Sequence, residues 1–130
     1  AAVTVCGPPT LIPPHLEELG IRVSWDVREA IREADVLMLL RIQHERQDAP
    51  LVPSLHEYRL RYGIDRERIT LAKPDVIVMH PGPINRGVEL DSDVADGPHS
   101  VILDQVTNGI AVRMAALYLV SGGSRAEETA

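Results

Sequence analysis

The apolar residues of this chain gather into four short runs, and the segments between the runs carry helix signals. The four runs are residues 2–6, 21–25, 36–40 and 76–79. Each has the length of a strand, and several are rich in β-branched side chains. Strands that alternate with helices at short spacing predict a doubly wound α/β domain with a mostly parallel sheet and flanking helices, a Rossmann-like architecture.

The run 36–40 is apolar at every position (Val-Leu-Met-Leu-Leu), whereas half-buried strands alternate apolar and polar residues. A continuous run is typical of a parallel strand covered on both faces. We therefore expect this strand to lie in the interior of the sheet.

Capping residues predict where the first two helices begin. Pro13 and Pro14 favour a short helix over residues 15–19, which Gly20 ends. Asp26, with Glu29 three residues later, predicts a capping box at the start of an amphipathic helix whose apolar stripe extends to residue 34.

The same signals recur in the middle of the chain. Ser54 and Glu57 predict a second capping box and a helix to about Tyr62, stopped by Gly63. Asp65 can cap one or two further helical turns before the strand at residues 76–79.

The last third of the chain divides into three parts. Residues 91–98 are polar and turn-like, and residues 99–120 have helical character with an expected break at Asn108 and Gly109. Residues 121–130 are small and polar and predict a disordered tail. We therefore expect one domain over residues 1–120.

Composition narrows the class of protein. The 130 residues are 45% hydrophobic and carry a formal net charge of −6, with 13 Lys and Arg scattered among 19 Asp and Glu. No basic stripe is present, so nucleic acid is not an expected partner. No apolar stretch is long enough to span a bilayer, so no membrane is expected either. Cys6 is the only cysteine, which favours a reducing, cytoplasmic setting.

Several kinds of chemistry have no support in the sequence. There is no glycine-rich dinucleotide loop, no Walker loop, no His-Glu-x-x-His pair and no EF-hand loop, so we expect no cofactor and no metal. Cys6 has no identifiable base beside it, which argues against nucleophilic catalysis. Because the first strand begins almost at residue 1, we also expect the domain to belong to a longer polypeptide.

The first candidate site follows the run 36–40, where Arg41 and Gln43 leave the end of a predicted strand. A guanidinium can grip a carboxylate through two parallel hydrogen bonds, and a nearby Gln can add a neutral donor. The alternative is that Arg41 only forms a structural ion pair, for instance with Glu45. The position at the carboxyl end of a strand favours ligand binding.

The second candidate site is the loop His80-Pro81-Gly82-Pro83, directly after the last strand. Proline has no N–H group, so this rigid loop offers a ligand mainly carbonyl oxygens, which suit an NH₂ donor. Gly82 allows close approach to the backbone. The alternative is an ordinary rigid turn.

The sequence leaves the roles of four neighbouring side chains open. His80 could be an acid/base group. The preferred interpretation is a hydrogen-bonded structural residue, because this is the more common role of a lone histidine beside a buried strand. Arg86 and Glu89 could pair with each other or with a neighbouring domain, but we expect them on a solvated loop face. Asn85 has no assigned role.

These motifs together resemble one enzyme family. The segment 40–46 and the loop 80–83, followed by Gln105-Val106-Thr107-Asn108-Gly109 and by Arg113, closely resemble the carboxyl-terminal, aspartate-binding half of bacterial aspartate carbamoyltransferases. Ornithine carbamoyltransferases share the plan, but they carry Ser-Met-Gly and His-Cys-Leu-Pro at the two loops. The resemblance therefore favours the aspartate enzymes.

The resemblance implies a role for each loop residue. Arg41 and Gln43 would bind the side-chain carboxylate of L-aspartate, and Glu45 would orient Arg41. The carbonyls of Pro81, Gly82 and Pro83 would hold the amino group of carbamoyl phosphate, with His80 in support.

The resemblance also implies a reaction and its partners. Carbamoyl transfer to aspartate gives N-carbamoyl-L-aspartate for pyrimidine synthesis without a cofactor. The family plan includes an amino-terminal phosphate-binding domain, which is missing here and against which the last helix would pack, a homotrimer of catalytic chains, and in some members a regulatory or dihydroorotase partner. Two other functions stay open: transfer to ornithine or another amino acid, and non-catalytic amino-acid binding.

Overall fold

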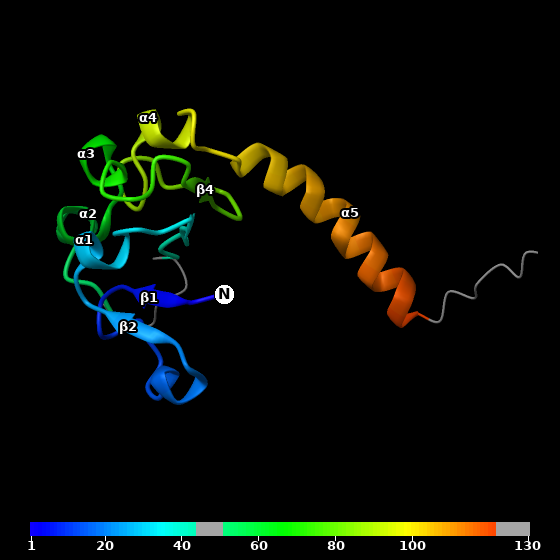
Figure 1. Ribbon diagram of the computed structural model, residues 1–130, viewed down its shortest axis with the longest axis horizontal. Coiled ribbons are helices and arrows are strands. Elements are labelled where there is room, and N and C mark those ends of the chain that lie inside the picture. The colour runs from blue at the N-terminus through cyan, green and yellow to red at the C-terminus, as the bar shows by residue number, and fades with distance from the viewer. Residues whose placement is uncertain (44–50, 122–130) are drawn as a thin grey trace, which may run out of the picture.

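A computed structural model describes residues 1–43 and 51–121 of the chain. Its strands form two parallel pairs, in which β1 (Thr4–Cys6) lies beside β2 (Arg22–Ser24) and β3 (Val36–Met38) beside β4 (Ile77–Met79). Helices connect the strands of each pair, as parallel neighbours require (Figure 1). The predicted α/β class and parallel pairing are confirmed.

The strand pairs form two separate two-stranded sheets within the described residues, rather than one continuous ladder. The expectation that the run 36–40 is covered on both faces is wrong for this chain. Leu37 is buried, whereas Val36 and Met38 are 48% and 50% exposed. One face of the β3–β4 pair is therefore apolar and open.

Within residues 1–43 and 51–121, six helical segments accompany the strands. Five are short: the 3₁₀ helix η1 (Leu16–Leu19), α1 (Val27–Ala30), α2 (Leu55–Tyr62), α3 (Arg66–Ile69) and α4 (Ser92–Ala95). The sixth, α5 (Ile102–Val120), has 19 residues. The α4 turn lies in the segment that we expected to be turn-like throughout.

The predicted caps are only partly confirmed. The side chains of Asp26 and Ser54 accept hydrogen bonds from the backbone N–H groups of Arg28 (2.8 Å) and Glu57 (3.0 Å). The reciprocal half of the first capping box is wrong, because the carboxylate of Glu29 accepts hydrogen bonds from Ser24 (3.2 Å) and from an arginine of β2. The α1 helix also ends at residue 30, earlier than the apolar stripe suggested.

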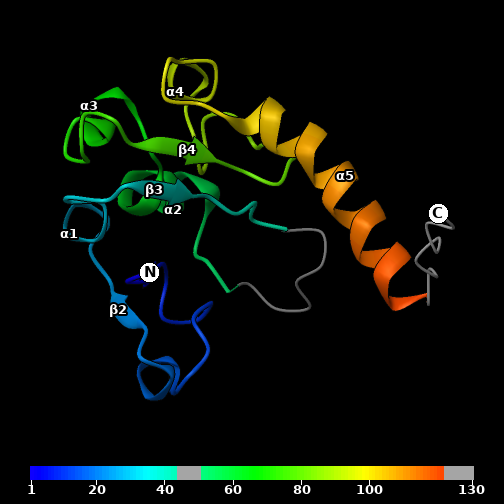
Figure 2. The same ribbon diagram turned by 45° about the vertical axis from the view of Figure 1, so that its right-hand side comes forward.

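The expected break at Asn108 and Gly109 is also wrong, since α5 is continuous. A glycine inside a helix costs only about 1 kcal/mol relative to alanine, which a long helix tolerates. Beyond its first turn α5 projects away from the strands (Figures 1 and 2). Its apolar side chains are exposed as a result, among them Val112, Leu117 and Leu119 at 67–76%.

The hydrophobic core surrounds β4. Val78 and Leu90 are fully buried, and Ile64 and Val76 are 1% exposed. The N–H of Ile64 donates to Glu89 O (3.0 Å) and its carbonyl accepts from Asp91 N (2.9 Å), so the segment after α2 is tied to the segment after the His80 loop. No helix in residues 1–43 or 51–121 is both long and apolar enough to cross a bilayer.

A buried arginine closes the end of α2. Arg68 is 9% exposed, and its guanidinium donates to the backbone carbonyls of Arg59, Leu60 and Gly63. The Arg59 carbonyl also accepts a hydrogen bond from the N–H of Gly63 (3.0 Å), and the guanidinium adds donors for the carbonyls at this end of the helix. Arg68 therefore joins α3 to the C-terminus of α2.

Replacing this arginine tests the arrangement. We expect Arg68→Met to lower the free energy of unfolding by about 2 kcal/mol, because the carbonyls lose a charged donor. The measurement is urea denaturation, with Arg66→Met as the matched control, since Arg66 is exposed and pairs with Asp93 at the surface. Equal losses in the two variants would contradict the role of Arg68.

Candidate functional site

The ends of β3 and β4 lie side by side, because Val36, Leu37 and Met38 pair in parallel register with Ile77, Val78 and Met79. The register continues one residue further, where Leu39 N donates to Met79 O (2.9 Å). Both candidate segments begin at this edge of the sheet. The structure therefore brings them together, as the sequence predicts.

Asn85 joins the two segments directly. Its Oδ1 accepts a hydrogen bond from Arg41 Nε (3.3 Å), and its Nδ2 donates to the carbonyl of Ile42 (3.0 Å). One amide thus holds both the side chain of Arg41 and the backbone that follows it. No local sequence pattern predicts this role of Asn85, because the partners of its side chain are more than 40 residues away.

The predicted site residues of the first segment differ in burial. Arg41 is partly buried and Gln43 is exposed. Glu45, the predicted partner of Arg41, lies outside the described residues.

The loop after β4 is held by its own histidine. The backbone N–H of Gly82 donates to His80 Nδ1 (2.9 Å), and Gly82 has a φ of 66°, a conformation that glycine adopts easily. The flanking Pro81 and Pro83 are exposed. The tip of the loop is therefore open to solvent while its base is anchored inside.

His80 itself is fully buried. Its backbone N–H donates to Gln105 Oε1 (2.9 Å), which links the loop to α5. Its Nε2 lies 3.4 Å from Glu89 Oε1. Because the Gly82 amide can only donate, Nδ1 must accept, and the ring proton belongs on Nε2, facing the carboxylate. In this geometry His80 is an interior hydrogen-bonded residue with no contact with solvent.

The expectation that Glu89 lies on a solvated face is wrong. Its side chain is 2% exposed, and its Oε1 accepts a hydrogen bond from the backbone N–H of Asn85 (2.6 Å). Arg86 is on the surface and forms a bidentate pair with Asp96 (2.7 and 2.8 Å). Glu89 is buried because its backbone pairs with Ile64, which local sequence cannot indicate.

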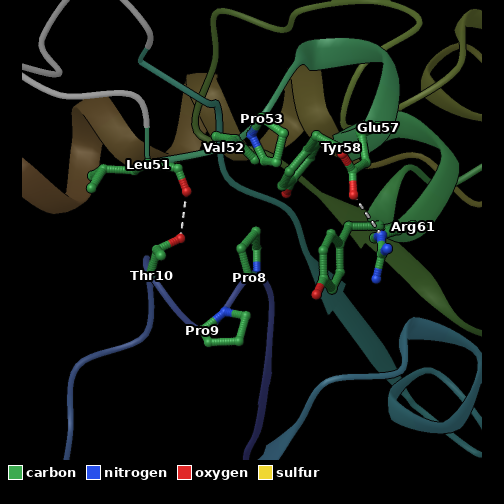
Figure 3. A pocket seen from close by; sticks show the side chains of 10 residues that line it. Pro8, Pro9, Thr10, Leu51, Val52, Pro53, Glu57, Tyr58 and Arg61 are labelled. Atoms are coloured by element: carbon green, nitrogen blue, oxygen red, sulfur yellow. Dashed lines mark hydrogen bonds and ion pairs between the residues drawn. The ribbon is translucent and has the colours of Figure 1, made fainter.

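A hollow among the described residues lies elsewhere. It has a volume of about 240 Å³ and is walled by the turn after β1, the segment before α2, and the rings of Tyr58 and Tyr62 (Figure 3). Thr10 donates across it to the carbonyl of Leu51, and Arg61 pairs with Glu57 (3.0 Å). None of the predicted site residues that the structure describes lines this hollow.

Burial acts on the single cysteine. Desolvation raises the pKa of the Cys6 thiol to about 11, and the negative charges of Asp26 and Glu29 add to the effect. The thiolate is therefore scarce near neutral pH, which disfavours a nucleophilic role. Within the described residues, no three His, Cys, Asp or Glu side chains are grouped so that they could hold a metal ion.

A parallel α/β domain whose strand ends carry an arginine and a proline-rich carbonyl loop has the features of a carbamoyltransferase amino-acid-binding domain. The family profile described as "Aspartate/ornithine carbamoyltransferase, Asp/Orn binding domain" matches residues 5–120. The chain belongs to this family.

Two similar curated proteins are both named aspartate carbamoyltransferase catalytic subunit. The protein from Syntrophotalea carbinolica is 59% identical over 130 residues, which is the whole of this chain and 42% of the relative. The protein from Opitutus terrae is 60% identical over 123 residues, 95% of this chain and 39% of the relative. The chain thus spans about two fifths of the length of these relatives.

Solved structures of both branches of the family are similar. Ornithine carbamoyltransferase from Pyrococcus furiosus has a TM-score of 0.77 and 29% identity, covering 96% of this chain and 43% of that one. Aspartate transcarbamoylase from Trypanosoma cruzi, in complex with carbamoyl phosphate and aspartate, has a TM-score of 0.72 and 30% identity, covering 90% of this chain and 40% of that one.

The setting of Cys6 predicts its reactivity. At pH 8 we expect iodoacetamide to modify this thiol roughly a hundredfold more slowly than a free thiol, because the thiolate fraction falls with each unit of raised pKa. Mass spectrometry of quenched samples measures the rate. Unfolding in urea should restore ordinary reactivity, and fast alkylation of the folded chain would contradict the burial of Cys6.

Proposed function

We propose that this chain is the aspartate-binding part of an aspartate carbamoyltransferase, which transfers the carbamoyl group of carbamoyl phosphate to the amine of L-aspartate. The products are N-carbamoyl-L-aspartate and phosphate. The observation that carries the proposal is the meeting of Arg41 with the loop after β4 through Asn85. The names of relatives at 59–60% identity support it.

Each predicted site residue has a task in this proposal. Arg41 binds the side-chain carboxylate of aspartate, assisted by Gln43, because a guanidinium fork matches a carboxylate. Glu45 orients Arg41. The carbonyl oxygens of residues 81–83 accept hydrogen bonds from the amino group of carbamoyl phosphate, and His80 supports that loop from below.

The reaction then follows from positioning. The α-amine of aspartate adds to the carbamoyl carbon, the tetrahedral intermediate loses phosphate, and the proton of the amine passes to the departing phosphate. Two substrates held at neighbouring strand ends react as if they were joined in one molecule. This positioning supplies a large share of the lowering of the activation barrier in such an enzyme. Donors fixed around the developing charge contribute the rest.

The main alternative concerns which amino acid accepts the carbamoyl group. The Pyrococcus furiosus structure is named for ornithine, whose side chain is cationic, whereas aspartate has a carboxylate. A guanidinium at the end of β3 attracts a carboxylate and repels an ammonium group, so Arg41 favours aspartate. A non-catalytic binding module is the remaining alternative, and it predicts no turnover of either acceptor.

The surroundings of the site complete the proposal. We assign residues 1–120 to the aspartate-binding domain and residues 121–130 to a tail, of which only residue 121 is described. The exposed apolar faces of α5 and of the β3–β4 pair suit packing against an amino-terminal, phosphate-binding domain. A cytoplasmic homotrimer of catalytic chains, with or without a regulatory or dihydroorotase partner, is part of the same proposal.

Substitution of Arg41 tests the aspartate role. In the native gene product that contains this domain, we expect Arg41→Ala to raise the KM for aspartate by about a hundredfold or more, because the carboxylate loses a bidentate partner. Steady-state assays of carbamoyl-aspartate formation measure the change. Arg66→Ala, which removes an exposed arginine of α3, should leave the KM unchanged. An unaltered saturation curve in Arg41→Ala would refute the role.

The isolated 130-residue chain is expected to be inactive. It carries the proposed aspartate and carbamoyl contacts, but no phosphate-binding loop of the kind that the family resemblance implies. Incubation with carbamoyl phosphate and aspartate should release phosphate at the blank rate, and titration calorimetry should show weak aspartate binding. Robust phosphate release would show that the chain needs no further domain.

A further inference from the structure

The two proposed recognition elements are joined beneath the surface by one carboxylate. Glu89 Oε1 accepts the backbone N–H of Asn85 (2.6 Å) and lies 3.4 Å from His80 Nε2. Glu89 and His80 are 2% and 0% exposed, so both contacts are shielded from water. Ionisable groups are seldom buried this deeply without a structural or functional reason.

One branch of this network leads to Arg41. The Glu89 bond fixes the backbone of Asn85, and the Asn85 amide in turn accepts from Arg41 Nε (3.3 Å) and donates to Ile42 O (3.0 Å). Because the amide contacts the guanidinium and the adjacent backbone at once, it restricts the direction in which Arg41 points. A shift of Asn85 therefore moves the proposed carboxylate-binding group.

The other branch leads to the carbonyl loop. His80 Nδ1 accepts the N–H of Gly82 (2.9 Å), so that N–H points into the protein. The Pro81–Gly82 peptide is trans, unlike the Gly82–Pro83 peptide, and in a trans peptide the N–H and C=O point in opposite directions. The carbonyl of Pro81 consequently points away from His80, towards the exposed side of the loop.

Glu89 also faces the nitrogen of His80 that does not accept, since its Oε1 lies 3.4 Å from Nε2 without forming a hydrogen bond. A carboxylate facing Nε2 favours a proton on that nitrogen, which leaves Nδ1 as the acceptor that the Gly82 amide needs. Glu89 therefore contacts the same ring whose Nδ1 holds the Gly82 amide and, through that peptide, the Pro81 carbonyl.

We propose that Glu89 is a positioning residue that couples the two substrate contacts, holding Arg41 through Asn85 and directing the Pro81 carbonyl outward through His80. The proposal rests on the proposed function, since it assigns Glu89 to the same site. It differs from a purely structural role because the two branches serve different substrates.

The test is a set of variants in the native gene product, with the KM for aspartate and for carbamoyl phosphate measured separately. Asn85→Ala should raise the KM for aspartate about tenfold and change that for carbamoyl phosphate less than about twofold. His80→Gln cannot place an acceptor at the Nδ1 position. It should raise the KM for carbamoyl phosphate about tenfold and change that for aspartate less than about twofold. His80→Asn keeps an acceptor there and should restore most of the carbamoyl phosphate affinity.

Glu89 should affect both substrates. Glu89→Leu removes the acceptor and should raise both KM values, whereas Glu89→Gln keeps one acceptor oxygen and should stay closer to the wild type in each. Glu67→Gln makes the same chemical change at an exposed carboxylate paired with Arg28 and should alter neither.

The outcomes separate the two proposals. If the wild-type protein makes no carbamoyl aspartate, the proposed function fails. If the wild type is active but Asn85→Ala and His80→Gln raise both KM values together, or lower only kcat or stability, the coupling role of Glu89 is overturned. Should Glu89→Leu fail to fold, the opposite effects of the Asn85 and His80 variants still decide the matter.

Discussion

The parallel register of β3 and β4 is the constraint on which the candidate site depends. Parallel neighbours end at the same edge of a sheet, so residues that follow the two strands meet although about 40 positions separate them in the chain. An antiparallel pairing, or a helix in place of either strand, would separate Arg41 from the His80 loop. The buried contacts of Asn85 and Glu89 then refine a meeting that the strand pairing already provides.

Features governed by local interactions could be predicted from the sequence. The four strands, the caps at Asp26, Ser54 and Asp65, and the stop at Gly20 follow from the conformations and hydrogen bonds of a few adjacent residues. The two candidate loops belong to the same class, because their place at strand ends follows from the order of apolar and polar residues.

Features that depend on distant partners could not be predicted from the sequence. Glu29 bonds to β2 instead of to its own helix cap, and Glu89 is buried by pairing with a segment 25 residues earlier. The apolar pattern predicted that Val36 and Met38 would be buried, but both are half-exposed. Such a pattern indicates that a strand packs against another segment, but it does not identify that segment. A single glycine also suggested a break in α5, but the helix is long enough to tolerate that residue.

The loop of residues 81–83 has a polarity that follows from its composition. Two of its three residues are prolines, and the one remaining amide hydrogen is turned inward to the imidazole of His80. Its exposed backbone therefore presents lone pairs and no hydrogens, so it repels anionic oxygens as well as attracting amines. A small molecule with a neutral amide at one end and a dianion at the other would meet this surface in a single direction, with its charged end facing outward.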